Sequence, residues 1–170
     1  MNNVNQFEKI SLNQFKKDME EYGLTEDIIE DIYKNIKLPT RATKGSAGYD
    51  FYSTLNCSLD SKDNIKIPTG IRAKIKDGVV LAVFPRSGMG FKYRLQLDNT
   101  VGIIDSDYYY SDNEGHIFIK VTNDTNDINK RCIINEGSAF AQGIFLPFDI
   151  TVDDNATGIR NGGMGSTDAK

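Results

Sequence analysis

The sequence of 170 residues has no tryptophan, a single histidine and only two cysteines. One histidine, His116, cannot supply a histidine-rich metal site and argues against a catalytic triad, so acid–base chemistry would fall to carboxylates. The spacing of Cys57 and Cys132 matches no metal or redox motif. We therefore expect two reduced thiols in a cytoplasmic protein.

An excess of positive charge and a long apolar run are also missing. The formal net charge is −4, and the lysines and arginines are scattered singly. Such a surface would repel a nucleic acid polymer, whereas a single nucleotide chelated to a cation stays compatible. We expect no signal peptide and no membrane association. At this length the chain should fold as one domain.

Residues 1–37 carry a helical pattern and are predicted to form an extension to the main domain. Ser11 suits the N-cap of an amphipathic helix that ends at Gly23. Thr25 opens a second helix, which stops before Leu38-Pro39. The apolar faces of both helices need burial, either on the same subunit or on a neighbouring one.

Residues 38–149 have the hydrophobic period of β-strands. In residues 71–84, Asp77-Gly78 separates two strand-like runs, which predicts a hairpin. Residues 117–122 alternate between apolar and other side chains, and residues 139–146 form a nearly continuous apolar strand. Short strands at regular spacing predict an all-β fold, either a compact β-barrel or a jelly-roll sandwich.

The last segment, residues 150–170, turns polar and rich in glycine. A segment of this composition buries too little apolar surface to order itself, so we expect a flexible arm. The chain is thus expected to have three parts: a helical extension, a β core and this arm.

Between Pro85 and Tyr108 the chain joins a phosphate-binding turn to a turn that carries carboxylates. The tetrapeptide PRSG from Pro85 offers a bidentate cation, a hydroxyl and an open backbone N–H, the donors that suit phosphate. Downstream, GIIDSDY from Gly102 places two carboxylates and a tyrosine after a short apolar run. Either half alone is typical of ordinary surface turns. Their combination in one segment is the most informative feature of the sequence.

Together with further motifs, this segment resembles the trimeric dUTP diphosphatase (dUTPase) family, in particular its Gram-positive and phage members. The motifs, in family order, are AGYDFYS from Ala47, PRSGMG from Pro85, NTVGIIDSDY from Asn99, AFAQGIF from Ala139 and RNGGMGST from Arg160. The first three match closely and the last two less well. The resemblance implies a dUTPase-like barrel or jelly roll that hydrolyses dUTP to dUMP and pyrophosphate with Mg²⁺.

The resemblance also implies roles for residues of the catalytic centre. Asp105 matches the general base that activates a water for attack on the α-phosphate, and Gln142 matches a residue that contacts phosphate or that water. Asp50 matches the acid that holds Mg²⁺ through the metal's water shell, and it could equally be a structural partner of an arginine. The resemblance places the phosphate oxygens on Arg86, Ser87 and the backbone of Gly88.

The same resemblance assigns the rest of the nucleotide. Uracil would be read by a β-hairpin that includes Asn99, Gly102 and Ile104, with Asn99 as the side-chain contact. Tyr108 would lie beneath the deoxyribose and exclude a 2′-hydroxyl, with ordinary tyrosine packing as the alternative. The arm would close over the substrate through Arg160, Met164, Gly165, Ser166 and Thr167.

Three features depart from the family pattern. Met164 stands where many members have a phenylalanine that stacks on uracil, so Tyr93 or Phe91 could cover the base instead. The segment Tyr109–Glu114 is longer than the expected turn, as an exposed insertion or as a contact surface. Residues 1–37 replace the usual short lead-in to the first strand.

The resemblance further implies a homotrimer whose active sites are shared between subunits. Two other functions stay open. A dCTP deaminase-like enzyme would have the same fold, although the GIIDSDY run favours phosphate hydrolysis over deamination. A phage-type dUTPase with a regulatory role would use its extra helices or its tyrosine loop to bind a protein partner.

Overall fold

The structure is a computed structural model, which describes residues 3–160 and residue 162. Met164, Gly165, Ser166 and Thr167 lie outside the described residues, so their expected contacts with substrate stay predictions. The elements, in chain order, are β1 (Gln6–Lys9), α1 (Leu12–Met19), the 3₁₀ helix η1 (Glu20–Tyr22), α2 (Glu26–Asn35), β2 (Thr40–Arg41), β3 (Tyr49–Tyr52), β4 (Cys57–Leu59), β5 (Asn64–Pro68), β6 (Ile71–Lys74), β7 (Val79–Pro85), α3 (Ser87–Tyr93), β8 (Leu95–Leu97), β9 (Gly102–Ile104), the 3₁₀ helix η2 (Ser106–Tyr110), β10 (Phe118–Asn123), β11 (Cys132–Ile134) and β12 (Ala139–Pro147).

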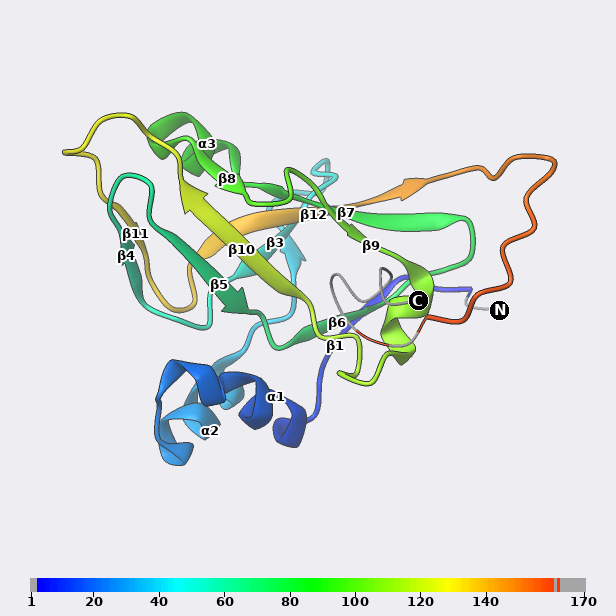
Figure 1. Cartoon of the computed structure of the whole chain (residues 1–170), viewed down its shortest axis with the longest axis horizontal. Coiled ribbons are helices and arrows are strands. Elements are labelled where there is room, and N and C mark those ends of the chain that lie inside the picture. Colours follow the sequence, from blue (N-terminus) through cyan, green and yellow to red (C-terminus); the bar gives the residue numbers. More distant parts are fainter. Residues whose placement is uncertain (1–2, 161, 163–170) are drawn as a thin grey trace.

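The strands form one five-stranded sheet and three smaller sheets, all antiparallel (Figure 1). The large sheet has the order β2-β3-β12-β7-β9, and the three-stranded sheet has the order β5-β10-β8. Strands β1 and β6 form one pair, and β11 and β4 form another. The all-β, jelly-roll-like prediction is confirmed. Of the two forms expected, the strands in the described part of the chain do not make a closed barrel.

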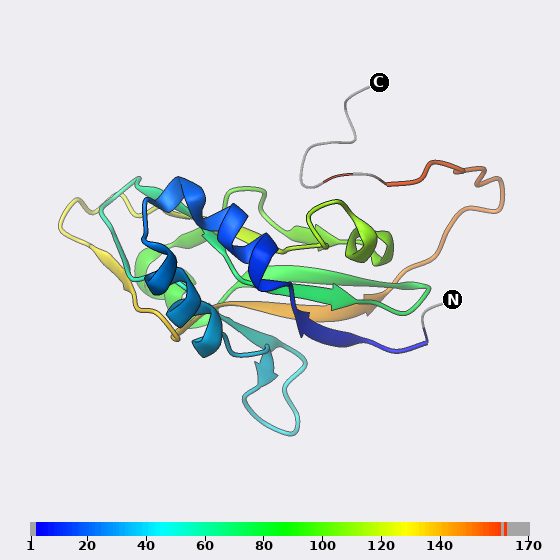
Figure 2. The same cartoon turned by 90° about the horizontal axis from the view of Figure 1, so that it is seen from below.

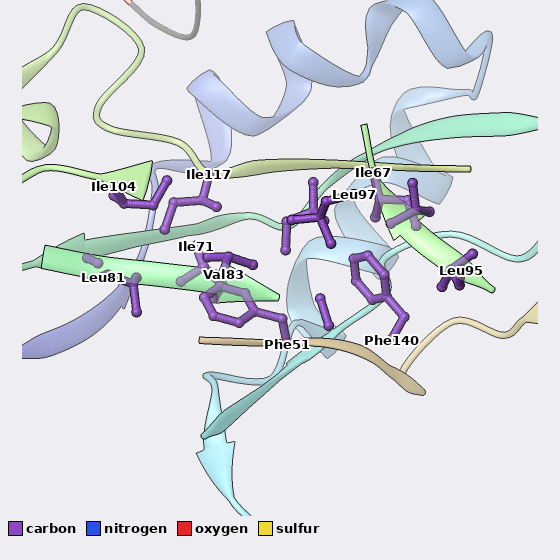
Figure 3. Close-up of a cluster of buried hydrophobic side chains, with 14 of the residues drawn as sticks. Phe51, Ile67, Ile71, Leu81, Val83, Leu95, Leu97, Ile104, Ile117 and Phe140 are labelled. Atoms are coloured by element: carbon purple, nitrogen blue, oxygen red, sulfur yellow. The ribbon is translucent and has the colours of Figure 1, made fainter. Parts of the chain in front are cut away.

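The main core lies between the five-stranded and the three-stranded sheets (Figure 3). Phe51, Leu81 and Val83 come from the first sheet. Ile67 and Leu97 come from the second, and all five side chains are 4% exposed or less. Burying one such side chain contributes roughly 1.5–3 kcal/mol. The alternating pattern of the strands therefore fixes which face of each sheet turns inward.

The two predicted helices of the extension are confirmed, and they pack on the chain's own β core (Figure 2). Ser11 caps α1, since its hydroxyl accepts the N–H of Gln14 at 3.1 Å. Gly23 ends the following 3₁₀ turn with a φ of 65°, a conformation that favours glycine. The apolar faces meet in a second, smaller core of Ile10, Phe15, Met19, Ile29, Ile32 and Leu55.

Residues 1–37 are not helical throughout, because Gln6–Lys9 form strand β1. This strand pairs antiparallel with β6, and Phe7 packs on Tyr49 and Phe51 with ring centroids 5.4 and 5.6 Å apart. Its partner is more than sixty residues away, so no local pattern could reveal the pairing.

The hairpin predicted for residues 71–84 is wrong. Asp77-Gly78 do form a turn, in which the N–H of Val79 donates to the carbonyl of Lys76 at 3.3 Å. The strands it joins belong to different sheets, since β6 pairs with β1 while β7 pairs with β12 and β9. Both strands bury alternate residues in the same core, but they do so from different sheets.

After β12, the chain runs out beyond the sheet and returns toward residues 105–110 (Figures 1 and 2). Arg160 reaches that region and contacts Asp105 and Asp107. No helix in the described part of the chain is long and apolar enough to cross a membrane.

Candidate active site

The first group of predicted site residues lies on three adjacent strands of the five-stranded sheet. In the ladder, Gln142 of β12 stands opposite Asp50 of β3 on one side and Phe84 of β7 on the other. The register shifts by one residue between Ala139 and Ala141, a bulge of the kind that re-aims side chains beside functional sites. The bulge thus brings the Gln142 amide and the Asp50 carboxylate to neighbouring positions.

Arg86 joins this group from the end of β7. Its Nε lies 3.2 Å from Oδ1 of Asp50, and the Asp50 side chain is 17% exposed. The Gln142 amide donates to the carbonyl of Pro85 at 3.3 Å, so this glutamine has the partner that its burial requires. Helix α3 starts at Ser87, and an added Cβ at Gly88 would meet nothing within 4 Å. This cluster, which we call the phosphate half-site, combines a cation, a hydroxyl and open backbone.

The donor set of the phosphate half-site fits Mg²⁺ held through water. The described residues contain no group of three or more acidic, cysteine or histidine side chains that could bind a metal directly. Mg²⁺ keeps several waters and commonly sits between substrate phosphates and one or two carboxylates. Asp50 supplies such a carboxylate and also forms an ion pair with Arg86 through Oδ1. Both roles considered for Asp50 are therefore compatible with one geometry.

Gly48 makes room for the Gln142 amide, which gives a testable prediction. A Cβ at position 48 would lie 2.6 Å from Oε1 of Gln142, so Gly48→Ala must displace that side chain. For the hydrolysis that the family resemblance implies, we expect kcat to fall about tenfold to a hundredfold, the usual cost of misplacing a group at a reacting centre. Steady-state kinetics would measure it. Gly45→Ala is the matched control, because its Cβ would meet nothing within 4 Å, and equal losses in both variants would contradict this role for Gly48.

The second group of predicted residues lines a cavity of about 470 Å³ beside β9. Asn99, Gly102, Ile104, Tyr108 and Arg160 all contribute to its wall. Apolar side chains from β7, β8 and β10 complete the wall, so the cavity can take a flat, largely apolar ring. We call this cavity, together with Asp105 at its edge, the nucleoside half-site.

The segment that carries Asn99 is a tight turn and not the expected β-hairpin. The N–H of Thr100 donates to the carbonyl of Leu97 at 2.9 Å, and Thr100 has a φ of 67°. Strands β8 and β9 flank the turn but pair with β10 and β7 respectively, not with each other. Gly102 packs closely, since its Cβ would lie 3.2 Å from Cβ of Val83. The turn thus brings Asn99, Val101 and Gly102 to the cavity wall.

Tyr108 forms a buried part of the cavity wall and is only 4% exposed. Its hydroxyl donates to the carbonyl of His116 at 2.6 Å and accepts the Asn113 amide at 2.9 Å. Burial raises the pKa of Tyr108, so the hydroxyl stays a neutral donor. These bonds hold the ring in one position. A ring that excludes a 2′-hydroxyl by contact needs such a fixed position.

Asp105 stands at the N-cap position of η2 without a side-chain capping bond, and it forms an ion pair with Arg160 of the arm. The same guanidinium bonds Asp107, with Nε 2.9 Å from Oδ1. Arg160 is a predicted site residue, whereas Asp107 is an additional contact that the sequence marks only as the second acid of GIIDSDY. Asp98 and Lys120 also line the cavity and form an ion pair, with Nζ of Lys120 2.9 Å from Oδ2 of Asp98. Neither residue was predicted from the sequence. In the sequence, only its position directly before Asn99 indicated that Asp98 could line the cavity.

The two half-sites lie at opposite ends of β7. Gly102 pairs with Val83 and Ile104 with Leu81, so Asp105 follows toward the start of β7 while Arg86 lies beyond its end. At 3.3–3.4 Å per residue, this register separates Asp105 from Arg86 by roughly 20 Å. A single described chain therefore does not bring the predicted base and the predicted phosphate ligands together.

Neither aromatic residue proposed to cover uracil lies at the cavity of this chain. Phe91 projects from α3 and is 93% exposed, and Tyr93 packs against the main core. Both belong to the end of β7 that carries the phosphate half-site. Their role, like that of Met164, stays a prediction.

The longer segment Tyr109–Glu114 is only partly exposed. Ser111 is buried, whereas the Tyr110 side chain is 67% exposed. Tyr109 and Glu114 bond Glu8 and Ser11 of the N-terminal extension. The segment therefore packs against the extension, and a protein partner for its exposed tyrosine stays a prediction.

Comparison with known proteins gives consistent matches. A family model described as dUTPase matches residues 34–168. A deoxyuridine 5′-triphosphate nucleotidohydrolase from Lactococcus lactis is 40% identical over 142 residues, which cover 81% of this chain and 93% of that protein. The crystal structure of dUTPase from Streptococcus mutans matches with a TM-score of 0.62 and 32% identity, and the match covers 85% of this chain and 97% of that one.

A phage structure extends the likeness in fold. A variant dUTPase from phage phi11 of Staphylococcus aureus matches with a TM-score of 0.64 and 21% identity, over 92% of this chain and 98% of that one. That structure is described as showing the coordination of a structural Mg(II) ion. At this identity the match concerns the fold alone.

Proposed function

The chain belongs to the dUTPase family, and from this premise we propose how its residues hydrolyse dUTP to dUMP and pyrophosphate. One observation carries the assignment of the site. Four residues predicted to read the nucleoside, namely Asn99, Gly102, Ile104 and Tyr108, line one cavity, and Asp105 follows directly after Ile104 at its edge. A nucleotide with its base and sugar in this cavity would place its 5′-phosphates near a carboxylate.

In this proposal the turn at residues 99–102 reads the uracil edge with backbone groups and the Asn99 side chain. A site that hydrogen-bonds a base edge rejects other bases strongly, because a mismatched base leaves buried polar groups unpaired. The buried ring of Tyr108 then packs beneath the deoxyribose. Its fixed position leaves a 2′-hydroxyl no room, which would favour dUTP over UTP.

Asp105 acts as the general base. Its carboxylate accepts a proton from a water that attacks the α-phosphorus, and the bond from that phosphorus to the bridging oxygen breaks, so pyrophosphate leaves. Arg86, Ser87 and the backbone of Gly88 hold the phosphate oxygens, and Gln142 contacts phosphate or the water. Mg²⁺ bound near Asp50 would supply positive charge to the triphosphate. Arg160, released from Asp105 by substrate, would turn to the phosphates.

A complete site needs more than one subunit. The separation of roughly 20 Å along β7 exceeds what one catalytic centre spans, so the phosphate half-site of one subunit must meet the nucleoside half-site of another. This supports the homotrimer with shared sites that the family resemblance implies. The exposed aromatic residue Phe91, carried with the phosphate half-site, would then come toward the uracil of a neighbouring subunit.

A nucleotide panel tests the proposed function. We expect pyrophosphate release from dUTP in the presence of Mg²⁺, with activity against dCTP, dTTP and UTP lower by about a hundredfold or more. Removing Mg²⁺ with EDTA should lower the rate with dUTP, because the triphosphate charge is no longer neutralised. Pyrophosphate and ammonia assays would measure both products. Ammonia release from dCTP would instead identify a deaminase.

A further inference from the structure

The N-terminal extension contacts the segment that follows Tyr108 at three separate points. Tyr109 donates its hydroxyl to Glu8 of β1 at 2.7 Å. Ser11 donates to the Glu114 carboxylate through its backbone N–H at 2.8 Å and through its hydroxyl at 2.6 Å. In the third contact, Oδ2 of Asp18 in α1 lies 2.6 Å from Nδ1 of His116. The two departures from the family pattern, a longer start and a longer turn, therefore form one structural unit.

His116 is the most constrained of these contacts. Its ring is fully buried, and Nε2 accepts the N–H of Gly70 at 2.8 Å. Since Nε2 is an acceptor, Nδ1 carries the proton and donates it to the Asp18 carboxylate. Burial lowers the pKa of His116 more than the charges of Asp18 and Glu114 raise it, which keeps the ring neutral. Both ring nitrogens are engaged, so the ring cannot turn without losing a bond.

The backbone of His116 in turn holds Tyr108. The His116 carbonyl accepts the Tyr108 hydroxyl at 2.6 Å, so a displacement of His116 moves the acceptor of that bond. Gly115, which precedes it, has a φ of 70°, and a Cβ there would lie 2.7 Å from the carbonyl oxygen of Tyr108. The chain between Tyr108 and His116 thus forms a tight loop whose two ends are hydrogen-bonded to each other. Asp18 bonds the His116 end of this loop.

We propose that the N-terminal extension is part of the specificity apparatus of the enzyme, with Asp18 and His116 as positioning residues that hold Tyr108 against the sugar. This inference rests on the proposed role of Tyr108 beneath the deoxyribose. In it, the extension sets how sharply the enzyme distinguishes deoxyribonucleotides from ribonucleotides. A purely structural extension would change stability or expression and leave that distinction intact.

The test compares kcat/KM for dUTP and for UTP in the full-length chain. In Asp18→Ala, which leaves Nδ1 of His116 without its acceptor, we expect the ratio of dUTP to UTP to fall about tenfold. Asp18→Asn retains an acceptor oxygen and should restore most of the ratio. Asp27→Asn, an exposed position on the neighbouring helix α2, changes the charge equally and should leave the ratio unchanged.

Two further variants keep the result decisive. Glu114→Ala removes both bonds to Ser11 at the surface, so it should fold even if Asp18→Ala does not, and it should also lower the ratio. Tyr108→Ala separates the inference from the proposed function. If Tyr108→Ala lowers the ratio while folded Asp18→Ala and Glu114→Ala do not, the inference is overturned. If Tyr108→Ala leaves the ratio unchanged, the proposed role of Tyr108 fails, and the inference fails with it.

Discussion

Asp105→Asn is expected to lower kcat for dUTP by about a hundredfold to ten-thousandfold while the protein still binds the nucleotide. Asparagine has nearly the shape of aspartate and cannot take a proton from the attacking water, so the loss falls on the chemical step. In the proposed site, nucleotide binding rests on the cavity wall and the phosphate half-site, which the substitution leaves in place. Single-turnover kinetics and binding of a non-hydrolysable dUTP analogue would measure the two quantities separately.

The ion pair with Arg160 calls for a matched control. Asp105 and Asp107 both bond this guanidinium, so either substitution to asparagine weakens the attachment of the arm. Only Asp105 follows directly after the cavity residue Ile104 and matches the base in the family motif. Asp107→Asn should therefore lose far less activity than Asp105→Asn. Equal losses would assign the effect to the arm, and near-normal turnover in Asp105→Asn would remove it as the base.

Mixing two inactive variants is expected to restore activity. Arg86→Ala disables the phosphate half-site, and Asp105→Asn disables the nucleoside half-site. If each site joins half-sites from two subunits, random assembly of equal amounts gives about a quarter of the sites two intact halves. The unfractionated mixture should then show about a quarter of the wild-type rate. Coexpression of the two variants with different affinity tags, followed by purification on both, would isolate the mixed oligomers; as trimers these would have one intact site in three and should show about a third of the wild-type rate.

A second mixture serves as the control. Asp50 and Arg86 form an ion pair within one half-site, so each variant subunit lacks part of the same half. Mixed oligomers of Asp50→Ala and Arg86→Ala should therefore stay inactive. If mixed oligomers of Arg86→Ala and Asp105→Asn are isolated and show no recovery, the sharing of sites between subunits is contradicted.

Local signals predicted much of the fold. The helix limits followed from Ser11 and Gly23, whose capping and left-handed conformation are properties of a few neighbouring residues. The long apolar strand β12 followed from its composition. Strand pairing did not follow, because the partners of β6 and β7 are set by packing between distant segments. The turn at Asp77-Gly78 has the residues of a hairpin turn. Its two flanking strands nevertheless join different sheets, because their pairing is set by core packing.

The sequence by itself determined the family and predicted the site residues, because the chemistry of phosphate, metal and base recognition depends on side-chain type and spacing within short motifs. The tertiary structure decided how those residues are grouped. It placed Asp50, Arg86 and Gln142 in one half-site and Asp105 in another, at opposite ends of β7. It also joined Asp18 to His116, across nearly a hundred residues of chain. Contacts at such separations arise from the packing of sheets and helices, which no local pattern encodes.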